Sequence, residues 1–283
     1  MKALSYIDNQ VAYYGKYFSM KHEEGKLNLH PVNAPAASGQ RKTAGAGSAR
    51  KVLQILFAFS EHRREATVVE LAEVIGAPVP TTYRHVALLK ELRLLEEGRT
   101  GNYHPTARVM PLARAAQLSN AVARIGRPII AETSERLRET VMLLQRVGDS
   151  GVCVELTECD RPMRFTFQRG HSIPLGIGAS GKMLLACLPQ EVQLAKLQEF
   201  KNHQALRHEL AEAGDRQFAT SNGEMDEGVW ACSVPVLVEG GGTFVLSVAG
   251  PAARISDAAK DTALDVLRRS AQRIREECEE YAL

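Results

Sequence analysis

The chain has 283 residues, with 35 Lys and Arg against 33 Asp and Glu, so its formal net charge is only +2. Hydrophobic residues make up 45% and charged residues 24%, which excludes a fully disordered or collagen-like chain, and the length predicts about two domains. No apolar run approaches the ~20 residues of a membrane helix, and the first 20 residues lack the apolar core of a signal peptide. We therefore expect a cytoplasmic protein with no membrane partner.

Residues 1–47 are predicted to be a disordered tail. The stretch 31–48 is rich in Ala, Gly, Pro and Ser and has no hydrophobic periodicity. Order is expected to begin at Ser48, which can cap a first helix. One buried stripe of that helix consists of Val52, Ile55, Leu56 and Phe59.

Two further helices and a hairpin are expected before residue 106. A second helix follows Thr67, with apolar positions at Val68, Leu71, Ala72 and Ile75. Gly76 suits a left-handed turn, and a third helix spans 80–93 with one side formed by Thr82, Val86, Leu89 and Leu92. A short hairpin joins 94–96 to 103–105, with Gly101 in its turn. Together these elements predict a winged helix-turn-helix over residues 48–105.

The third helix carries the predicted DNA-reading face. If Thr82 faces the core, a rotation of about 100° per residue puts Arg84 on the opposite face. Arg can bond guanine bidentately, and hydroxyl groups hold phosphate oxygens. The candidate DNA-binding residues are Thr81, Tyr83 and Arg84 on the helix, and Arg99 and Asn102 at the hairpin tip. The competing interpretation is a small helical core whose charges are only solvated.

The small net charge conceals two halves of opposite sign. Residues 1–120 hold 16 Lys and Arg against 10 Asp and Glu, whereas residues 121–283 hold 19 against 23. Residues 51–108 alone hold 8 against 7, so most of the basic excess lies in the tail. A basic half attracts a phosphate backbone. The charge therefore permits double-stranded DNA as a partner without establishing it.

Residues 106–120 are predicted to form an amphipathic linker helix, which could pair two copies of the chain or pack on its own domain. The second domain, 121–283, reads as α+β around an antiparallel sheet. Its expected helices are 121–139, 170–188 (opened by a glycine-rich loop), 190–201, one around Glu209, and 257–281. Its expected strands are 141–147, 152–156, 165–167, 233–238 and 243–249.

Three segments resemble the IclR-type family of bacterial transcriptional regulators. They are T-V-V-E-L-A-E-V-I-G-A-P-V-P-T-T-Y-R-H at 67–85, G-H-S-I-P-L-G-I-G-A-S-G-K-M-L-L-A at 170–186, and D-E-G-V-W-A-C-S-V-P-V at 226–236 with L-S-V-A-G-P at 246–251. The resemblance covers about residues 48–280. It implies a winged helix-turn-helix, a GAF-like effector-binding domain, and homodimers or homotetramers on a palindromic operator.

The resemblance also implies a small-molecule site at the start of the 170–188 helix and on the strands facing it. The candidate effector-binding residues are Leu175, Gly176, Ile177, Gly178, Ala179, Ser180, Ser221, Glu224, Ala231, Ser247 and Ala249. Three of them depart from the family: Ser221 stands at an acidic position, Ala231 at a Cys position, and Ala249 where many members have Ser. A pocket without these groups suits a small, highly charged acid less well, so we expect a larger organic or aromatic acid as effector.

The same loop supports an alternative function. Residues 176–181 spell G-x-G-x-x-G, and they almost form a P-loop, except that Met183 stands where Ser or Thr would hold magnesium. Glu199 follows the glycine loop by about the 20 residues that separate a ribose-binding acid from such a loop, although it lies within a predicted helix. The alternative to an effector-controlled regulator is therefore a nucleotide-binding sensor or an enzyme.

Enzyme and metal signatures are weak. The five cysteines include no C-x-x-C pair, and neither H-E-x-x-H nor G-x-S-x-G occurs, so no catalytic residue, metal site or cofactor is assigned. Cys153 and Cys232 are interpreted as buried thiols rather than nucleophiles. Lys182 is expected to face solvent or cap the glycine loop. Three further basic residues could recognise a carboxylate or lie on the solvent side of strands: Arg146, Arg164 and Arg169. The prediction is a DNA-binding transcriptional regulator that is not an enzyme.

Overall fold

The computed structural model describes residues 43–60, 63–240 and 242–281. The described residues up to Ser119 form one compact unit, and those from Asn120 onward form another. The predicted tail lies outside the described residues up to position 42. Within the described ranges, no helix combines the length and apolarity needed to cross a bilayer.

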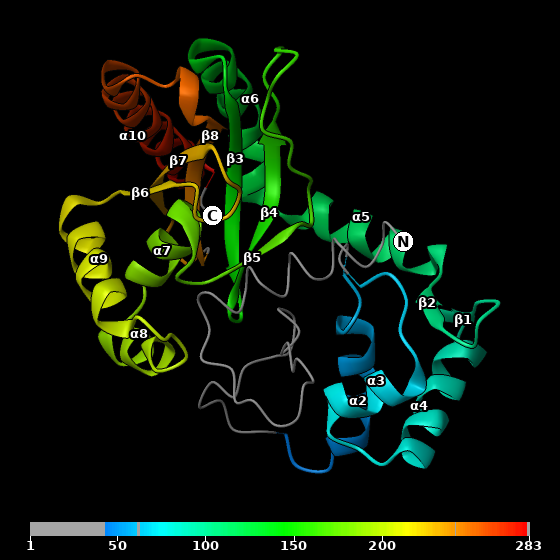
Figure 1. The fold of residues 1–283 in the computed structure, drawn as a ribbon. Helices are drawn as coiled ribbons and strands as arrows, with labels where there is room; N and C mark the ends of the chain where they lie inside the picture. The colour runs from blue at the N-terminus through cyan, green and yellow to red at the C-terminus, as the bar shows by residue number, and fades with distance from the viewer. Residues whose placement is uncertain (1–42, 61–62, 241, 282–283) are drawn as a thin grey trace. The chain divides into compact units, whose positions relative to one another are not determined.

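Up to Pro105, the described part of the first unit consists of three helices and a two-stranded hairpin, as expected (Figure 1). These elements are α2 (Gly47–Phe57), α3 (Val68–Ile75), α4 (Val79–Glu91), β1 (Leu95–Glu97) and β2 (Tyr103–Pro105). The prediction that Ser48 caps α2 is wrong, because helical backbone begins at Gly47 and the capping position falls on Ala46, which has no capping side chain.

Local signals define α3 at both ends. The Thr67 hydroxyl accepts a hydrogen bond from the Glu70 backbone N–H, and the Glu70 carboxylate accepts one from the Thr67 N–H at 2.7 Å, which completes a capping box. Gly76 ends the helix in the left-handed conformation at φ +56°. These ends set the short turn that leads into α4, whose first turn contains Pro80.

The core of this unit lies between the three helices and the hairpin. Its largest fully buried side chains are Ile55, Leu71, Leu89 and Leu95. Leu92 was expected on the buried side of the third helix, but it is 44% exposed because it lies just past the last helical residue of α4. The hydrophobic stripe of α4 therefore ends one turn earlier than predicted.

The segment that follows is a short 3-10 turn, η1 (Ala107–Val109), and a helix, α5 (Met110–Ser119). No residue of α5 is buried within the described structure, and Met110, Leu112 and Leu118 are all more than half exposed. The pairing of two copies through this helix stays a prediction.

The second unit is a six-stranded antiparallel sheet with helices on both faces, which confirms the expected α+β class (Figure 1). The strand order is β5-β4-β3-β8-β7-β6. The strands are β3 (Thr140–Val147), β4 (Ser150–Thr157), β5 (Ser172–Pro174), β6 (Ala219–Asn222), β7 (Val229–Leu237) and β8 (Thr243–Pro251). The helices are α6 (Ala121–Leu137), α7 (Gly178–Ala186), α8 (Gln190–Leu197), α9 (His203–Arg216) and α10 (Asp257–Glu280), with η2 (Ala252–Arg254) before α10.

Two hydrophobic layers hold this unit together. One face of the sheet packs against α6 and α10, with Leu143, Phe244 and Leu246 fully buried between them. The opposite face packs against α7 and the helices after it, with Met142 and Val245 buried there. Because both faces of the sheet are covered, the residues of β8 are buried continuously instead of alternating between buried and exposed.

Both edge strands differ from the prediction. Residues 165–167 form no strand; instead Phe165 and Phe167 stack on each other with ring centroids 5.7 Å apart. The edge beside β4 is formed by β5, three residues ending in Pro174. The other edge, β6, was not predicted because the sequence Ala-Thr-Ser-Asn carries no alternating apolar signal.

Candidate functional site

Helix α7 begins in a tight loop that glycine makes possible. Gly176 and Gly178 both have positive φ, at +83° and +65°, where side chains are rarely tolerated. Gly181, one turn into the helix, lies so close to β5 that an added Cβ would be 2.4 Å from the Pro174 carbonyl oxygen. The glycines therefore seat the first turn of α7 directly against β5.

Lys182, a residue of the same helix, is the centre of an ion cluster. Its ammonium lies 2.6 Å from Glu224 Oε1 and 2.9 Å from Glu209 Oε2, while its side chain is only 6% exposed. Burial lowers the pKa of Lys182, but the two carboxylates outweigh burial and hold that pKa above its ordinary value. The expectation that Lys182 faces solvent is wrong, and the lysine stays charged at neutral pH.

Three buried serines form a second polar group between α7 and the sheet. The hydroxyl of Ser180 lies 3.1 Å from that of Ser233 and 2.9 Å from that of Ser247, and the latter two are 2.7 Å apart. All three residues are under 10% exposed. In a closed triangle each hydroxyl can donate once and accept once, so the group satisfies itself inside an otherwise apolar layer.

The strand register places three predicted site positions in one row on the face toward α7. Ser221 of β6 pairs with Ala231 of β7, which pairs with Ala249 of β8. The neighbouring row contains Ser233 and Ser247. Directly paired residues point to the same face of a sheet, so the small side chains of the first row lie beside the serine triangle.

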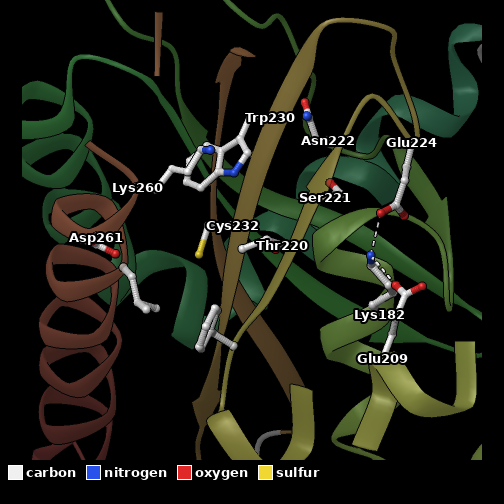
Figure 2. A pocket seen from close by; sticks show the side chains of 12 residues that line it. Lys182, Glu209, Thr220, Ser221, Asn222, Glu224, Trp230, Cys232, Lys260 and Asp261 are labelled. Atoms are coloured by element: carbon white, nitrogen blue, oxygen red, sulfur yellow. Dashed lines mark hydrogen bonds and ion pairs between the residues drawn. The ribbon is translucent and has the colours of Figure 1, made fainter. Parts of the chain in front are cut away.

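A cavity of about 530 Å³ opens along the edge strand β6. Figure 2 shows the Lys182 cluster on one side of the strand and Trp230 with the α10 residues on the other. The lining residues are Lys182, Glu209, Phe218, Thr220, Ser221, Asn222, Glu224, Trp230, Cys232, Lys260, Asp261 and Leu264. The lining of the cavity thus includes aromatic side chains, polar strand residues and charged groups of both signs.

The structure brings the predicted effector residues to one region but in different environments. Ser221 and Glu224 line the cavity, Ser180 and Ser247 belong to the serine triangle, and the remainder pack in the α7 layer: Leu175, Gly176, Ile177, Gly178, Ala179, Ala231 and Ala249. Sequence reasoning missed Ser233, which lies two residues beyond Ala231 and therefore on the same strand face. It also missed Glu209, a single helix carboxylate without a motif.

The glycine loop does not have the context of a nucleotide site. The strand before it, β5, is a three-residue antiparallel edge, whereas dinucleotide and P-loop folds place the loop after a buried parallel strand. The loop lysine, Lys182, is already paired with two carboxylates.

The candidate nucleophiles are deeply buried. Burial raises the pKa of both the Cys153 thiol and the Cys232 thiol to about 12. Such thiols are almost fully protonated at neutral pH and are poor nucleophiles. Among the described residues, no three His, Cys, Asp or Glu side chains gather as metal ligands.

Two of the arginines considered for carboxylate recognition are engaged within the chain. Arg169 Nε lies 2.7 Å from Oε1 of the buried Glu155, whose other oxygen is 2.8 Å from Arg127 Nε. Arg164 Nε donates to Glu158 at 2.7 Å. The side-chain Nε of the third, Arg146, is buried and makes no hydrogen bond in the described structure.

In the first unit, the predicted DNA-reading residues lie on α4 and the hairpin. Arg84 and Arg99 are exposed, Tyr83 is 55% exposed, and Thr81 is half-buried. The half-buried Asn102 donates its side-chain amide to Glu65 at 3.2 Å.

The two carboxylates of β1 are paired. Glu97 lies 2.6 Å from Lys90, and Glu96 lies 3.0 Å from His104. The Lys90 ammonium reduces the negative charge that Glu97 would present to a polyanion.

Comparison with known protein families gives matches over both units. The model described as "IclR helix-turn-helix domain" matches residues 48–99, and the model described as "Bacterial transcriptional regulator IclR C-terminal" matches residues 115–276. Among curated relatives, the probable transcriptional regulator SauR of Cupriavidus necator is 31% identical over 206 residues, covering 69% of this chain and 80% of that protein. The HTH-type transcriptional regulator TtgV of Pseudomonas putida is 27% identical over 81% of this chain and 89% of its own length.

Solved structures share the fold. An IclR family regulator from Brucella abortus has a TM-score of 0.75 at 20% identity, covering 89% of this chain and 99% of that one. An IclR homologue from Microbacterium hydrocarbonoxydans, solved with 4-hydroxybenzoate, has a TM-score of 0.64 at 21% identity over 82% of this chain and 99% of its own. Together with the family models, these matches show that the chain belongs to the IclR family of bacterial transcriptional regulators.

Proposed function

We propose that this regulator binds a palindromic operator as a homodimer or homotetramer and that an organic or aromatic acid in its second unit controls operator affinity. The observation that carries the proposal is the coexistence in one chain of an exposed recognition-type helix, α4, and a 530 Å³ cavity beside a buried polar layer. The first is suited to DNA and the second to a small molecule.

On the DNA side, we assign base reading to Arg84 and supporting contacts to Thr81, Tyr83, Arg99 and Asn102. Arg84 is exposed on α4, whereas Thr82, His85, Val86 and Leu89 hold the opposite side of that helix in the core. A bidentate Arg–guanine contact contributes ~1–3 kcal/mol of discrimination. Contacts to phosphate position the helix without reading sequence.

On the effector side, a carboxylic acid is supported by the donors at the start of α7, the Lys182 ammonium and the Gly178 N–H, and by the apolar side chains of the same layer. The solved homologue from Microbacterium hydrocarbonoxydans carries 4-hydroxybenzoate, an aromatic acid. We propose that the acid favours one geometry of the assembled protein. Operator affinity then changes by a factor set by the ratio of the acid's affinities for the two geometries of the protein.

The test is a fluorescence anisotropy titration of the full chain on DNA from upstream of its own gene, at several salt concentrations. Arg84→Ala is expected to weaken specific binding by ~1–3 kcal/mol, with effector binding unchanged. Arg136→Ala, which removes an exposed arginine from α6 of the second unit, serves as the matched control and is expected to leave operator affinity unchanged. Salt-sensitive binding without sequence preference in the wild type would refute the regulator mechanism, and unchanged affinity in Arg84→Ala would refute the assigned reading face.

A further inference from the structure

The loop between β6 and β7, residues 223–228, folds back onto the start of α7. The Glu224 carboxylate bridges two donors of the site, since Oε1 lies 2.6 Å from Lys182 Nζ and Oε2 accepts from the Gly178 N–H at 3.1 Å. The neighbouring Met225 packs against the same glycine, where its Cγ and Sδ lie 3.0 Å from the position of an added Cβ. One carboxylate and one apolar side chain thus occupy adjacent positions.

This pair has the chemistry of the effector class proposed above. An organic acid consists of a carboxylate and an apolar body, and the site offers a buried ammonium, a backbone N–H and an apolar surface. Glu224 and Met225 already fill those roles from within the chain. Lys182 also holds Glu209, so the cluster carries one positive and two negative charges.

A further carboxylate cannot join this cluster favourably. A third negative charge would share one ammonium with two carboxylates and would be repelled by both of them. An acid therefore has to replace one of the two carboxylates, and Glu224 is the one that also holds the Gly178 N–H. The geometry allows this, because Glu224 is 27% exposed while Lys182 is 6% exposed, so the acidic partner lies nearer to water than the basic one.

The loop also has the backbone needed to open and close. It is bounded by Gly223 and Gly228, at φ +69° and +77°, and nothing lies within 4 Å of an added Cβ at Gly228. The Gly223 N–H donates to the Val229 carbonyl at 2.8 Å, which closes the loop at its base. Rotation between these ends would release Glu224 and Met225 without unpairing β6 from β7.

We propose that the loop 223–228 is a built-in competitor for the effector, with Glu224 holding the effector-carboxylate position until an acid displaces it. This inference rests on the proposed function, since it concerns the same site. It makes Glu224 a specificity-determining residue: only a ligand that binds Lys182 more strongly than Glu224 does can enter. Release of the loop then accompanies effector binding.

The test measures the affinity of the full-length protein for benzoate, 4-hydroxybenzoate and phenylacetate, and for their uncharged amides, by titration calorimetry. Glu224→Ala is expected to raise affinity for the acids about tenfold or more, because a site that is mostly occupied by its own loop loses affinity in proportion to the unoccupied fraction. Affinity for the amides is expected to change little. Lys182 keeps Glu209 in this variant, which avoids a buried unpaired charge.

Glu227→Ala is the matched control, because it removes the same charge from an exposed position on the same loop. Its acid affinities are expected to equal those of the wild type. Equal gains for acids and amides, equal gains in both variants, or no acid binding to Glu224→Ala at millimolar concentration would each overturn the proposal. The anisotropy titration on operator DNA is a separate measurement, so failure of DNA binding with a selective gain for acids would refute the regulator mechanism and leave the competitor loop intact.

Discussion

Replacing Gly181 by Ala tests how closely α7 must approach β5. The added Cβ would lie 2.4 Å from the backbone carbonyl oxygen of Pro174 and 3.3 Å from the Gly176 nitrogen. Neither atom belongs to a flexible side chain, so relief requires the helix to move. That movement also stretches the 2.9 Å hydrogen bond from the Gly176 N–H to the Gly181 carbonyl.

The expected cost follows from these two effects. Overpacking a tight core costs ~1–3 kcal/mol, and weakening one hydrogen bond costs about 1 kcal/mol. Together they amount to roughly 2–4 kcal/mol, which corresponds to a fall in Tm of roughly 5–15 °C for a unit of this size. The expected gain in helix propensity from Gly to Ala, at most ~1 kcal/mol, does not offset it.

Gly214→Ala is the matched control. Gly214 lies in α9 with nothing within 4 Å of an added Cβ, so the same substitution should stabilise the protein by ~0.5–1 kcal/mol through helix propensity alone. Thermal unfolding followed by the fluorescence of Trp230, the single tryptophan of the chain, reports on the unit that contains both sites. Equal Tm values for the two alanine variants would refute the reasoning about close approach.

Three further outcomes are expected. Burial alone would raise the pKa of the Glu155 carboxyl, but hydrogen bonds from two arginines hold that pKa below its ordinary value. Because the folded pKa of Glu155 is depressed, this carboxylate stabilises the fold above about pH 4.5, and the stabilisation is lost as pH falls through the folded pKa. Glu155→Gln should cost ~1–2 kcal/mol in urea unfolding at pH 7, and a difference that does not shrink as pH is lowered would contradict the assignment. The thiols of Cys153 and Cys232 should resist a disulfide reagent at pH 8 until urea unfolds the chain, and fast labelling of the native protein would show that they are not buried. Thr67→Ala removes the capping box of α3 and should destabilise the first unit by ~1 kcal/mol in circular dichroism melts, whereas Thr67→Ser should restore most of it; equal losses in both variants would argue against the cap.

The helix-turn-helix unit could be predicted from sequence because its signals are local. Thr67 and Glu70 specify the start of α3, and Gly76 specifies its end, each through contacts within a few residues. The boundary misplaced at Ser48 lies where α2 begins without any capping side chain. The apolar stripe alone could not specify that residue.

The candidate site was only partly predictable because its contacts are long-range. Lys182 meets partners 27 and 42 residues away, and nothing in its neighbourhood of apolar helix residues indicates that two carboxylates converge on it. Ser233 and Ser180 are 53 residues apart and meet only through strand register and helix packing. The resemblance to a family located the region, whereas the structure was needed to show which groups are already paired.

The polar groups beneath α7 are difficult to explain by stability. A helix held on a sheet by apolar side chains would be at least as stable, since replacing a buried ion pair with hydrophobic residues of similar volume is often neutral or stabilising. Yet this helix, buried along almost its whole length, contributes Lys182 to an ion cluster and Ser180 to a hydroxyl triangle. Both groups adjoin the one face of the sheet where small residues, Ser221, Ala231 and Ala249, lie in a row. Charged and hydroxyl groups can exchange partners at small net cost when a ligand offers the same hydrogen bonds. The proposed replacement of Glu224 by an acid depends on this property, because Lys182 would exchange one carboxylate for another.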